Sequence, residues 1–253
     1  MSHLQQGQNI VAGTVSGAHG SIVMVLVASY NIRKAIASDR RRRPERILEI
    51  LSEIGADIVL LQEADRRFGE RHSAIPLHLL TEHSPYRPVP YEMRPGSIGW
   101  HGNAILIGPK VEIVRHMPLH LPSLEPRGAV LADVRAHGQA LRLVGMHLDL
   151  SGLWRRKQAR AILSELDHQP ERLPTLLAGD LNEWRGGGCI RDFCQHHMPV
   201  TLGPSFHARQ PVGKLDRMFV TPDIQIVDSG VHHSPLARNA SDHLPVWARI
   251  RIG

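Results

Sequence analysis

The segment Thr175-Leu176-Leu177-Ala178-Gly179-Asp180-Leu181-Asn182 places a carboxylate and a carboxamide at the end of a short apolar run. An apolar run of this length that ends in glycine predicts a buried strand. Because alternate residues of an extended segment point the same way, Asp180 and Asn182 should share a face. An Asx-type turn closing a strand would have the same sequence, so the polar residues elsewhere in the chain must decide between the two interpretations.

Other apolar runs rich in Val, Leu and Ile also border polar residues. Asn31 follows the run 23–28, Glu63 follows 57–61, His147 follows 140–144, Asp216 precedes 218–220, and Ser241-Asp242-His243 precedes 244–252. Carboxylates, amides and imidazoles of this number suit one hard cation and one phosphate. The combination is far more specific than any one of the motifs.

This order of residues resembles the endonuclease/exonuclease/phosphatase superfamily, which includes deoxyribonuclease I, abasic-site endonucleases, neutral sphingomyelinases and inositol-polyphosphate 5-phosphatases. The resemblance covers residues 23–252, nearly the whole chain, and is greatest to the small bacterial members. It implies a four-layer α/β/β/α sandwich of two mostly antiparallel sheets, with the active site at one end of the sheets.

The pattern of apolar residues agrees with that α/β fold. Pro44 can occupy the first turn of a helix, apolar residues then recur at helical spacing, and Gly55 supplies a stop. A second helix is predicted around 159–166, and each helix should begin just after a basic cluster, 40–43 or 155–157. Strand-like runs outnumber helices, and two packed sheets covered by helices would explain why several runs are continuously apolar. The further strands are expected at 103–107, 111–114, 129–134, 224–231 and 246–252.

The resemblance assigns the metal to three residues. Glu63 ends a buried strand and matches the family's metal-binding position, and Asn31 and Asp242 would complete the environment of the ion or its water. Oxygen ligands of this kind suit Mg²⁺, with Mn²⁺ as a possible substitute. Read alone, Glu63 would be a surface acid and Asn31 a turn residue.

The same resemblance assigns the catalytic roles. Asp180 would orient and deprotonate the attacking water, and His243, held by Asp216, would stabilise the phosphate or protonate the leaving group. Asn182 and His147 would donate hydrogen bonds to the non-bridging oxygens. Of the 17 histidines in the chain, only His147 and His243 occupy motif positions, and the others are taken as incidental.

The net charge of +6 and the pI of about 9.9 indicate an anionic partner. We expect five arginines to bind substrate phosphates: Arg127, Arg41, Arg42, Arg155 and Arg156. Arginines that are only solvated at the surface would give the same sequence pattern. Nucleic acid is therefore the expected substrate. A phospholipid headgroup or a small phosphoester is the alternative, and a non-catalytic scaffold of the same fold is a third possibility.

Two departures from the motifs of better-known branches narrow the choice of branch within the superfamily. Abasic-site endonucleases generally carry Tyr where His147 stands and an acid shortly after the first Asn, where this chain reads Asn31-Ile32-Arg33-Lys34. The 5-phosphatases have an aromatic residue and Cys before the Asp-Arg of their late motif, which here follows Lys214-Leu215. Both branches lose support.

Residues 1–22 are polar and small and lack the features of a signal peptide, so a disordered leader followed by one catalytic domain, 23–253, is expected. No apolar run reaches the roughly 20 residues of a membrane helix. The two cysteines, Cys189 and Cys194, form no zinc-binding cluster and are not expected to pair, which favours a cytoplasmic location. Nothing in the sequence indicates an oligomeric state.

Overall fold

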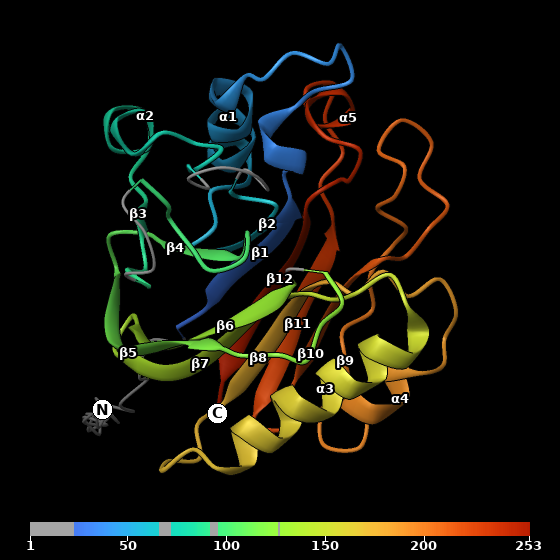
Figure 1. The fold of residues 1–253 in the computed structure, drawn as a ribbon. Helices are drawn as coiled ribbons and strands as arrows, with labels where there is room; N and C mark the ends of the chain where they lie inside the picture. Colours follow the sequence, from blue (N-terminus) through green and yellow to red (C-terminus); the bar gives the residue numbers. More distant parts are fainter. Residues whose placement is uncertain (1–22, 66–71, 92–95, 126) are drawn as a thin grey trace, which may run out of the picture.

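The computed structural model describes residues 23–65, 72–91, 96–125 and 127–253, which form two packed sheets (Figure 1). In spatial order, the first sheet contains β11 (Ile224–Val231), β12 (Val246–Ile252), β1 (Val25–Asn31), β2 (Ile58–Gln62), β4 (Ala104–Ile107) and β3 (Arg87–Pro88). The second contains β5 (Val111–Leu119), β6 (Gly128–Ala136), β7 (Gln139–His147), β8 (Thr175–Asp180), β10 (Asp216–Val220) and β9 (Met198–Pro199). Neighbouring strands are antiparallel except for the parallel pairs β1–β2 and β7–β8.

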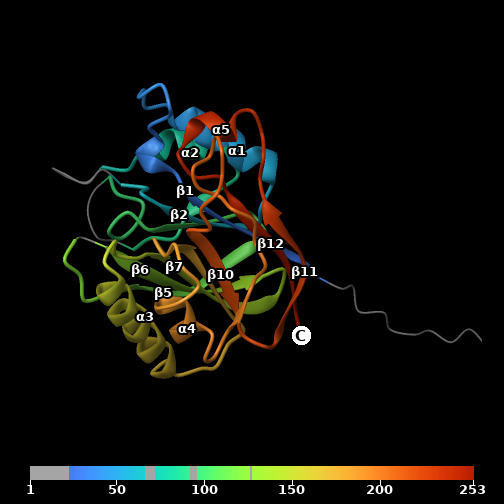
Figure 2. The same cartoon turned by 90° about the vertical axis from the view of Figure 1, so that its right-hand side faces the viewer.

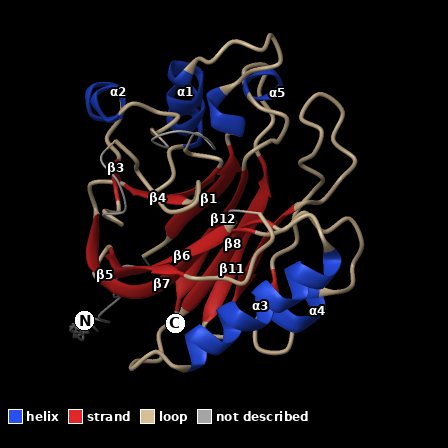
Figure 3. Cartoon of the chain, viewed as in Figure 1, coloured by secondary structure: helices blue, strands red, loops and turns tan. Residues whose placement is uncertain are grey.

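Helices cover the two outer faces of this pair of sheets (Figure 2, Figure 3). The first sheet carries α1 (Pro44–Ile54), α2 (Leu77–His83) and α5 (Ala237–Ala240), and the second carries α3 (Gly152–Asp167) and α4 (Cys189–Phe193). The expected α/β/β/α sandwich is therefore confirmed. Within the described ranges, none of the helices is long and apolar enough to cross a membrane.

The position of strand β2 between two layers explains why residues 58–61 are all apolar. Ile58 and Leu60 face the opposite sheet and join the central core, whereas Val59 and Leu61 face α1 and join the core beneath the helices. Every residue of β2 is buried as a result. Because burial of each such side chain contributes about 1.5–3 kcal/mol, a strand between two layers gains from apolar residues on both of its faces.

Helix α1 begins and ends where the sequence predicts. Pro44 occupies its first turn, and Gly55 ends it with a left-handed φ of 62°. Helix α3 begins earlier than predicted, at Gly152. The basic cluster 155–157 therefore lies inside its first turns and not before it. The start is set by the preceding loop, in which Asp149 Oδ1 accepts a hydrogen bond from the Ser151 amide at 2.9 Å.

The strand registers bring polar residues together at one end of the sandwich. In the first sheet Asn31 pairs with Gln62, so Glu63 follows directly at the same edge. In the second sheet Asp180 lies between His147 on β7 and Asp216 on β10. Two sets of polar side chains, one from each sheet, therefore meet at this edge.

Candidate active site

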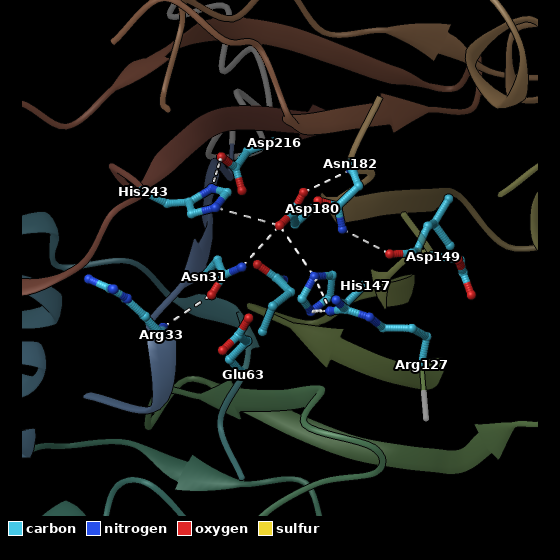
Figure 4. A network of polar contacts seen from close by, with 12 residues as sticks. Asn31, Arg33, Glu63, Arg127, His147, Asp149, Asp180, Asn182, Asp216 and His243 are labelled. Carbon is cyan, nitrogen blue, oxygen red and sulfur yellow. Dashed lines mark hydrogen bonds and ion pairs between the residues drawn. The ribbon is translucent and has the colours of Figure 1, made fainter. Parts of the chain in front are cut away.

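Asp180 is the centre of the polar cluster (Figure 4). Its Oδ2 atom accepts a hydrogen bond from Asn31 Nδ2 at 3.0 Å and lies 3.3 Å from His147 Nε2 and 3.6 Å from His243 Nε2. Its other oxygen, Oδ1, accepts a hydrogen bond from the backbone amide of Asn182 at 2.9 Å. Asp180 is 1% exposed, so a single buried carboxylate joins residues from both sheets.

These neighbours keep Asp180 ionised. Burial opposes its negative charge, but the imidazoles of His147 and His243 and the Asn182 amide outweigh that effect and hold the Asp180 pKa well below its usual range. Position 179 must be glycine for this geometry, because a Cβ atom there would lie 1.8 Å from the Met146 carbonyl oxygen. The close approach of β7 and β8 thus sets Asp180 beside His147.

His243 is positioned by Asp216. Its Nδ1 atom lies 2.8 Å from Asp216 Oδ2, and the Ser205 hydroxyl donates a short hydrogen bond to the same oxygen. Burial disfavours the imidazolium, but the carboxylates, Asp216 above all, raise the pKa of His243 to about 10. The ring of Phe206 packs 4.9 Å from the His243 ring. His243 is therefore a fixed, charged donor at neutral pH.

His147 contacts Arg127 on its other side. The Arg127 Nη1 atom lies 2.8 Å from His147 Nδ1, and Arg127 Nη2 lies 3.4 Å from Glu125 Oε2. Arg127 is buried, so its guanidinium is held beside His147 instead of extending into solvent. This places a permanent positive charge next to the residues expected to bind phosphate.

Asn182 follows β8 with a φ of 50°, a conformation that asparagine tolerates better than most residues. Its Nδ2 atom donates a hydrogen bond to the Leu148 carbonyl at 2.9 Å. An amide nitrogen has two hydrogens, so the bond to Leu148 uses one of them and leaves the other. The contact with Leu148 fixes the direction in which that second hydrogen points.

Glu63 comes directly after β2 in a left-handed conformation, with a φ of 53°. Its Oε2 atom lies 2.7 Å from Lys34 Nζ. Burial raises its pKa, but His147, Lys34 and Arg127 together lower it below the ordinary value. The turn at Gly102 packs against the backbone of Glu63. The Gly102 carbonyl accepts a hydrogen bond from the Ala64 amide, and a Cβ atom added at Gly102 would lie 3.5 Å from Glu63 Cα.

The donor atoms around Glu63 fit a hard, hydrated cation. Glu63 offers carboxylate oxygens and Asn31, on the neighbouring strand, an amide oxygen; the Asp242 carboxylate is the third donor expected from the sequence. The described residues include no cluster of three or more acidic, histidine or cysteine side chains suited to a metal. Mg²⁺ commonly uses only one or two carboxylates and completes its shell with water and substrate phosphate. Asp242 already pairs with Arg33, whose Nε atom lies 3.4 Å from its Oδ2.

Besides Arg127, the arginines predicted to bind phosphate divide into two pairs. Arg155 is buried, and its guanidinium is occupied by Glu183 Oε2 at 3.1 Å and by the Asp149 and Leu150 carbonyls. Arg156 pairs with the buried Asp192 of α4 at 3.2 Å, so this contact joins the two helices.

Arg41 and Arg42, in contrast, are exposed in the loop before α1. The Arg42 Nε atom donates a hydrogen bond to the Lys34 carbonyl at 3.2 Å. Arg42 therefore lies next to the turn that contacts Glu63, and Arg41 is its neighbour in the same exposed loop.

Three residues of the site were not predicted from the sequence as contributors: Lys34, Arg33 and Ser205. Lys34 and Arg33 directly follow the Asn31 motif, and that adjacency is the one signal that could have identified them. Ser205 reaches Asp216 from a loop 11 residues earlier, and no sequence pattern marks it.

Comparisons with known proteins agree with this fold. The sequence profile of the Endonuclease/Exonuclease/phosphatase family matches residues 28–243. YbhP from Escherichia coli K12 is 26% identical, over 89% of this chain and 96% of YbhP. The crystal structure of an endonuclease/exonuclease/phosphatase from Bacteroides vulgatus superposes with a TM-score of 0.74 at 17% identity, over 91% of this chain and all (100%) of that one. D. rerio TDP2 complexed with a single-strand DNA product gives a TM-score of 0.69 at 17% identity, over 90% and 98% of the chains.

Proposed function

Because the chain belongs to the endonuclease/exonuclease/phosphatase family, whose members are phosphoester hydrolases, we propose that it is a Mg²⁺-dependent phosphodiesterase that cleaves nucleic acid by direct attack of water. The observation that carries the proposal is the convergence of Asn31, His147 and His243 on one oxygen of the buried Asp180. A carboxylate held ionised among three donors is suited to hold and polarise a water molecule.

In this mechanism Asp180 accepts a hydrogen bond from the attacking water. Its lowered pKa makes it a weak base, so the water proton moves to Asp180 only as the new P–O bond forms and the attacking oxygen becomes acidic. His243, charged at neutral pH, gives its Nε2 proton to the ester oxygen as the bond from that oxygen to phosphorus breaks. The charge lost by His243 is balanced by the proton gained by Asp180.

The remaining residues stabilise the phosphate. Asn182, Arg127 and His147 would donate to the non-bridging oxygens, His147 by redirecting the Nε2 hydrogen that faces Asp180 in the substrate-free protein. Fixed donors of this type contribute about 3–4 kcal/mol each to transition-state stability. Glu63, Asn31 and Asp242 would hold Mg²⁺, which when bound neutralises charge on the phosphate. The short contacts within the cluster mean that these donors require little rearrangement.

Metal dependence is the first test of the proposal. Glu63→Gln removes the carboxylate charge but keeps the shape, so we expect Mg²⁺ affinity to fall by about tenfold or more, because paired charged groups contribute about 1.5–3 kcal/mol. Isothermal titration with MgCl₂ measures the affinity, and hydrolysis of bis-p-nitrophenyl phosphate, DNA and RNA with and without EDTA measures the dependence. Unchanged turnover in excess chelator, or wild-type metal affinity in Glu63→Gln, would contradict the assignment.

A nucleic-acid substrate predicts a role for the two exposed arginines of the loop before α1, of which Arg42 contacts the Lys34 turn. In Arg41→Gln/Arg42→Gln, we expect weaker binding of single-stranded DNA and a salt slope less steep by about one log-log unit per lost phosphate contact, with hydrolysis of the small reporter preserved. The matched control is Arg135→Gln/Arg249→Gln, which removes two exposed arginines from β6 and β12 at the opposite end of the sheets. An identical slope in both double variants would favour a small phosphoester substrate.

A further inference from the structure

Lys34 is joined to Glu63 by two contacts. Its ammonium lies 2.7 Å from Glu63 Oε2, and its backbone amide donates a hydrogen bond to the Glu63 carbonyl at 3.1 Å. The two side chains are 24% and 18% exposed, so the ion pair is largely shielded but open on one side. A cation of the chain thus occupies an oxygen of the carboxylate proposed to bind Mg²⁺.

The backbone around Lys34 adopts a conformation that side chains disfavour. Arg33, Lys34 and Ala35 have φ values of 47°, 57° and 57°, and none of them is glycine. In this left-handed region Cβ crowds the following carbonyl oxygen, so non-glycine residues rarely occupy it and runs of three are unusual. Such strain is found where function requires a particular geometry.

The left-handed turn places its two cations on the two acids proposed as metal ligands. Lys34 pairs with Glu63, and Arg33 pairs with Asp242 at 3.4 Å. Lys34 differs from Arg33 in having a compact charge on a flexible four-carbon stem. Its head group can therefore move between neighbouring acceptors while its backbone stays fixed to Glu63.

We propose that Lys34 is a phosphate-binding residue that competes with Mg²⁺ for Glu63 in the substrate-free protein and contacts the scissile phosphate when the metal takes that carboxylate. The proposal rests on the function proposed above. An ammonium and Mg²⁺ repel each other and prefer the same oxygen, so the metal weakens the Lys34–Glu63 pair. The incoming phosphate is the new anion at the open side of the site, and it attracts the released ammonium.

This dual role predicts two effects of opposite sign. Removing the Lys34 charge should strengthen Mg²⁺ binding, since the competitor is lost, and weaken phosphate binding, since a donor is lost. A residue that only supports the fold would weaken both when changed, and a solvated surface lysine would affect neither. The opposite signs therefore distinguish this role from support of the fold and from a solvated surface side chain.

The experiment compares three variants with a matched control. Lys34→Met removes the charge and keeps the length, and Lys34→Asn removes the charge with a residue that tolerates a positive φ. Lys34→Arg keeps the charge. Lys110→Met serves as the control. Lys110 is exposed in the turn after β4. The end of β4 pairs with the beginning of β2, whereas Glu63 follows the end of β2, so Lys110 lies at the opposite end of the sheet from Glu63. Circular dichroism and thermal unfolding confirm that each variant is folded.

Mg²⁺ affinity is measured by calorimetry without substrate, and inorganic phosphate affinity is measured at saturating Mg²⁺. In the two neutral variants we expect Mg²⁺ to bind about fivefold to tenfold more tightly and phosphate about tenfold more weakly. Lys34→Arg should retain most of the phosphate affinity, and Lys110→Met should match wild type in both measurements.

Mg²⁺ binding that is unchanged or weaker in both neutral variants, or phosphate binding that is unchanged, overturns the proposal. Neither measurement needs turnover, so a wild-type protein that binds no Mg²⁺ would instead refute the proposed function. A wild-type protein that binds Mg²⁺ with the same affinity as Lys34→Met and Lys34→Asn would refute the role of Lys34 alone.

Discussion

Replacing Asp180 with asparagine should lower kcat by about 10²- to 10⁴-fold, the usual contribution of a general acid-base group. Asparagine has nearly the same shape but cannot accept the water proton, and it cannot keep His147 and His243 paired with a negative charge. The KM and the affinity for inorganic phosphate should change far less than kcat, because the phosphate donors remain in place. Steady-state kinetics on the phosphodiester reporter, with phosphate binding as a separate assay, provide the comparison.

The same substitution at Asp133 separates catalysis from stability. Asp133 is also buried, and it pairs with Arg142 through two hydrogen bonds of 2.6 and 2.9 Å at the opposite end of the second sheet. Asp133→Asn should lower the free energy of unfolding and leave kcat close to wild type. If Asp180→Asn loses stability but retains near-normal turnover, Asp180 is a structural residue and the proposed mechanism is wrong.

The sequence allowed the fold to be predicted because its strongest signals are local. Strands such as β11 and β12 have the predicted bounds, and α1 begins at Pro44 and ends before Gly55, because apolar runs and helix-terminating residues act within a few positions. The helices α2 and α5 were not predicted. Each spans seven residues or fewer, too few for a periodic pattern to appear.

The ion pairs of the site depend on contacts that sequence patterns do not record. Arg155 has the appearance of a surface phosphate ligand in its basic run, but Glu183, 28 residues later, holds it inside the fold. The pairing of Lys34 with Glu63 depends on a left-handed turn in a segment without glycine, which local propensity argues against. Motif positions could thus be assigned from the sequence, but the partners that set their charge required the structure.

Asp216 and His243 should behave as one unit in a double-mutant cycle. His243→Ala and Asp216→Ala should each lower kcat/KM by about 10²-fold or more, and the double variant should be scarcely worse than either single variant. The physical reason is that Asp216, fully buried, acts on the substrate only through the His243 ring that it holds at 2.8 Å. Additive losses would show that the two residues act separately.

The pH dependence of the pair gives a second measurement. The nearby carboxylates, Asp216 above all, raise the pKa of His243 from 6.5 to about 10, so the stability that this charge cluster contributes is complete below pH 6.5 and is lost as the pH rises through about 10. In Asp216→Asn the His243 pKa should fall, because the main opposing charge is gone while burial remains. The alkaline limb of kcat/KM should therefore move to lower pH in Asp216→Asn, and thermal unfolding between pH 6 and 10 should show a smaller loss of stability than in wild type. An alkaline limb at the wild-type position in Asp216→Asn would mean that His243 is not the proton donor.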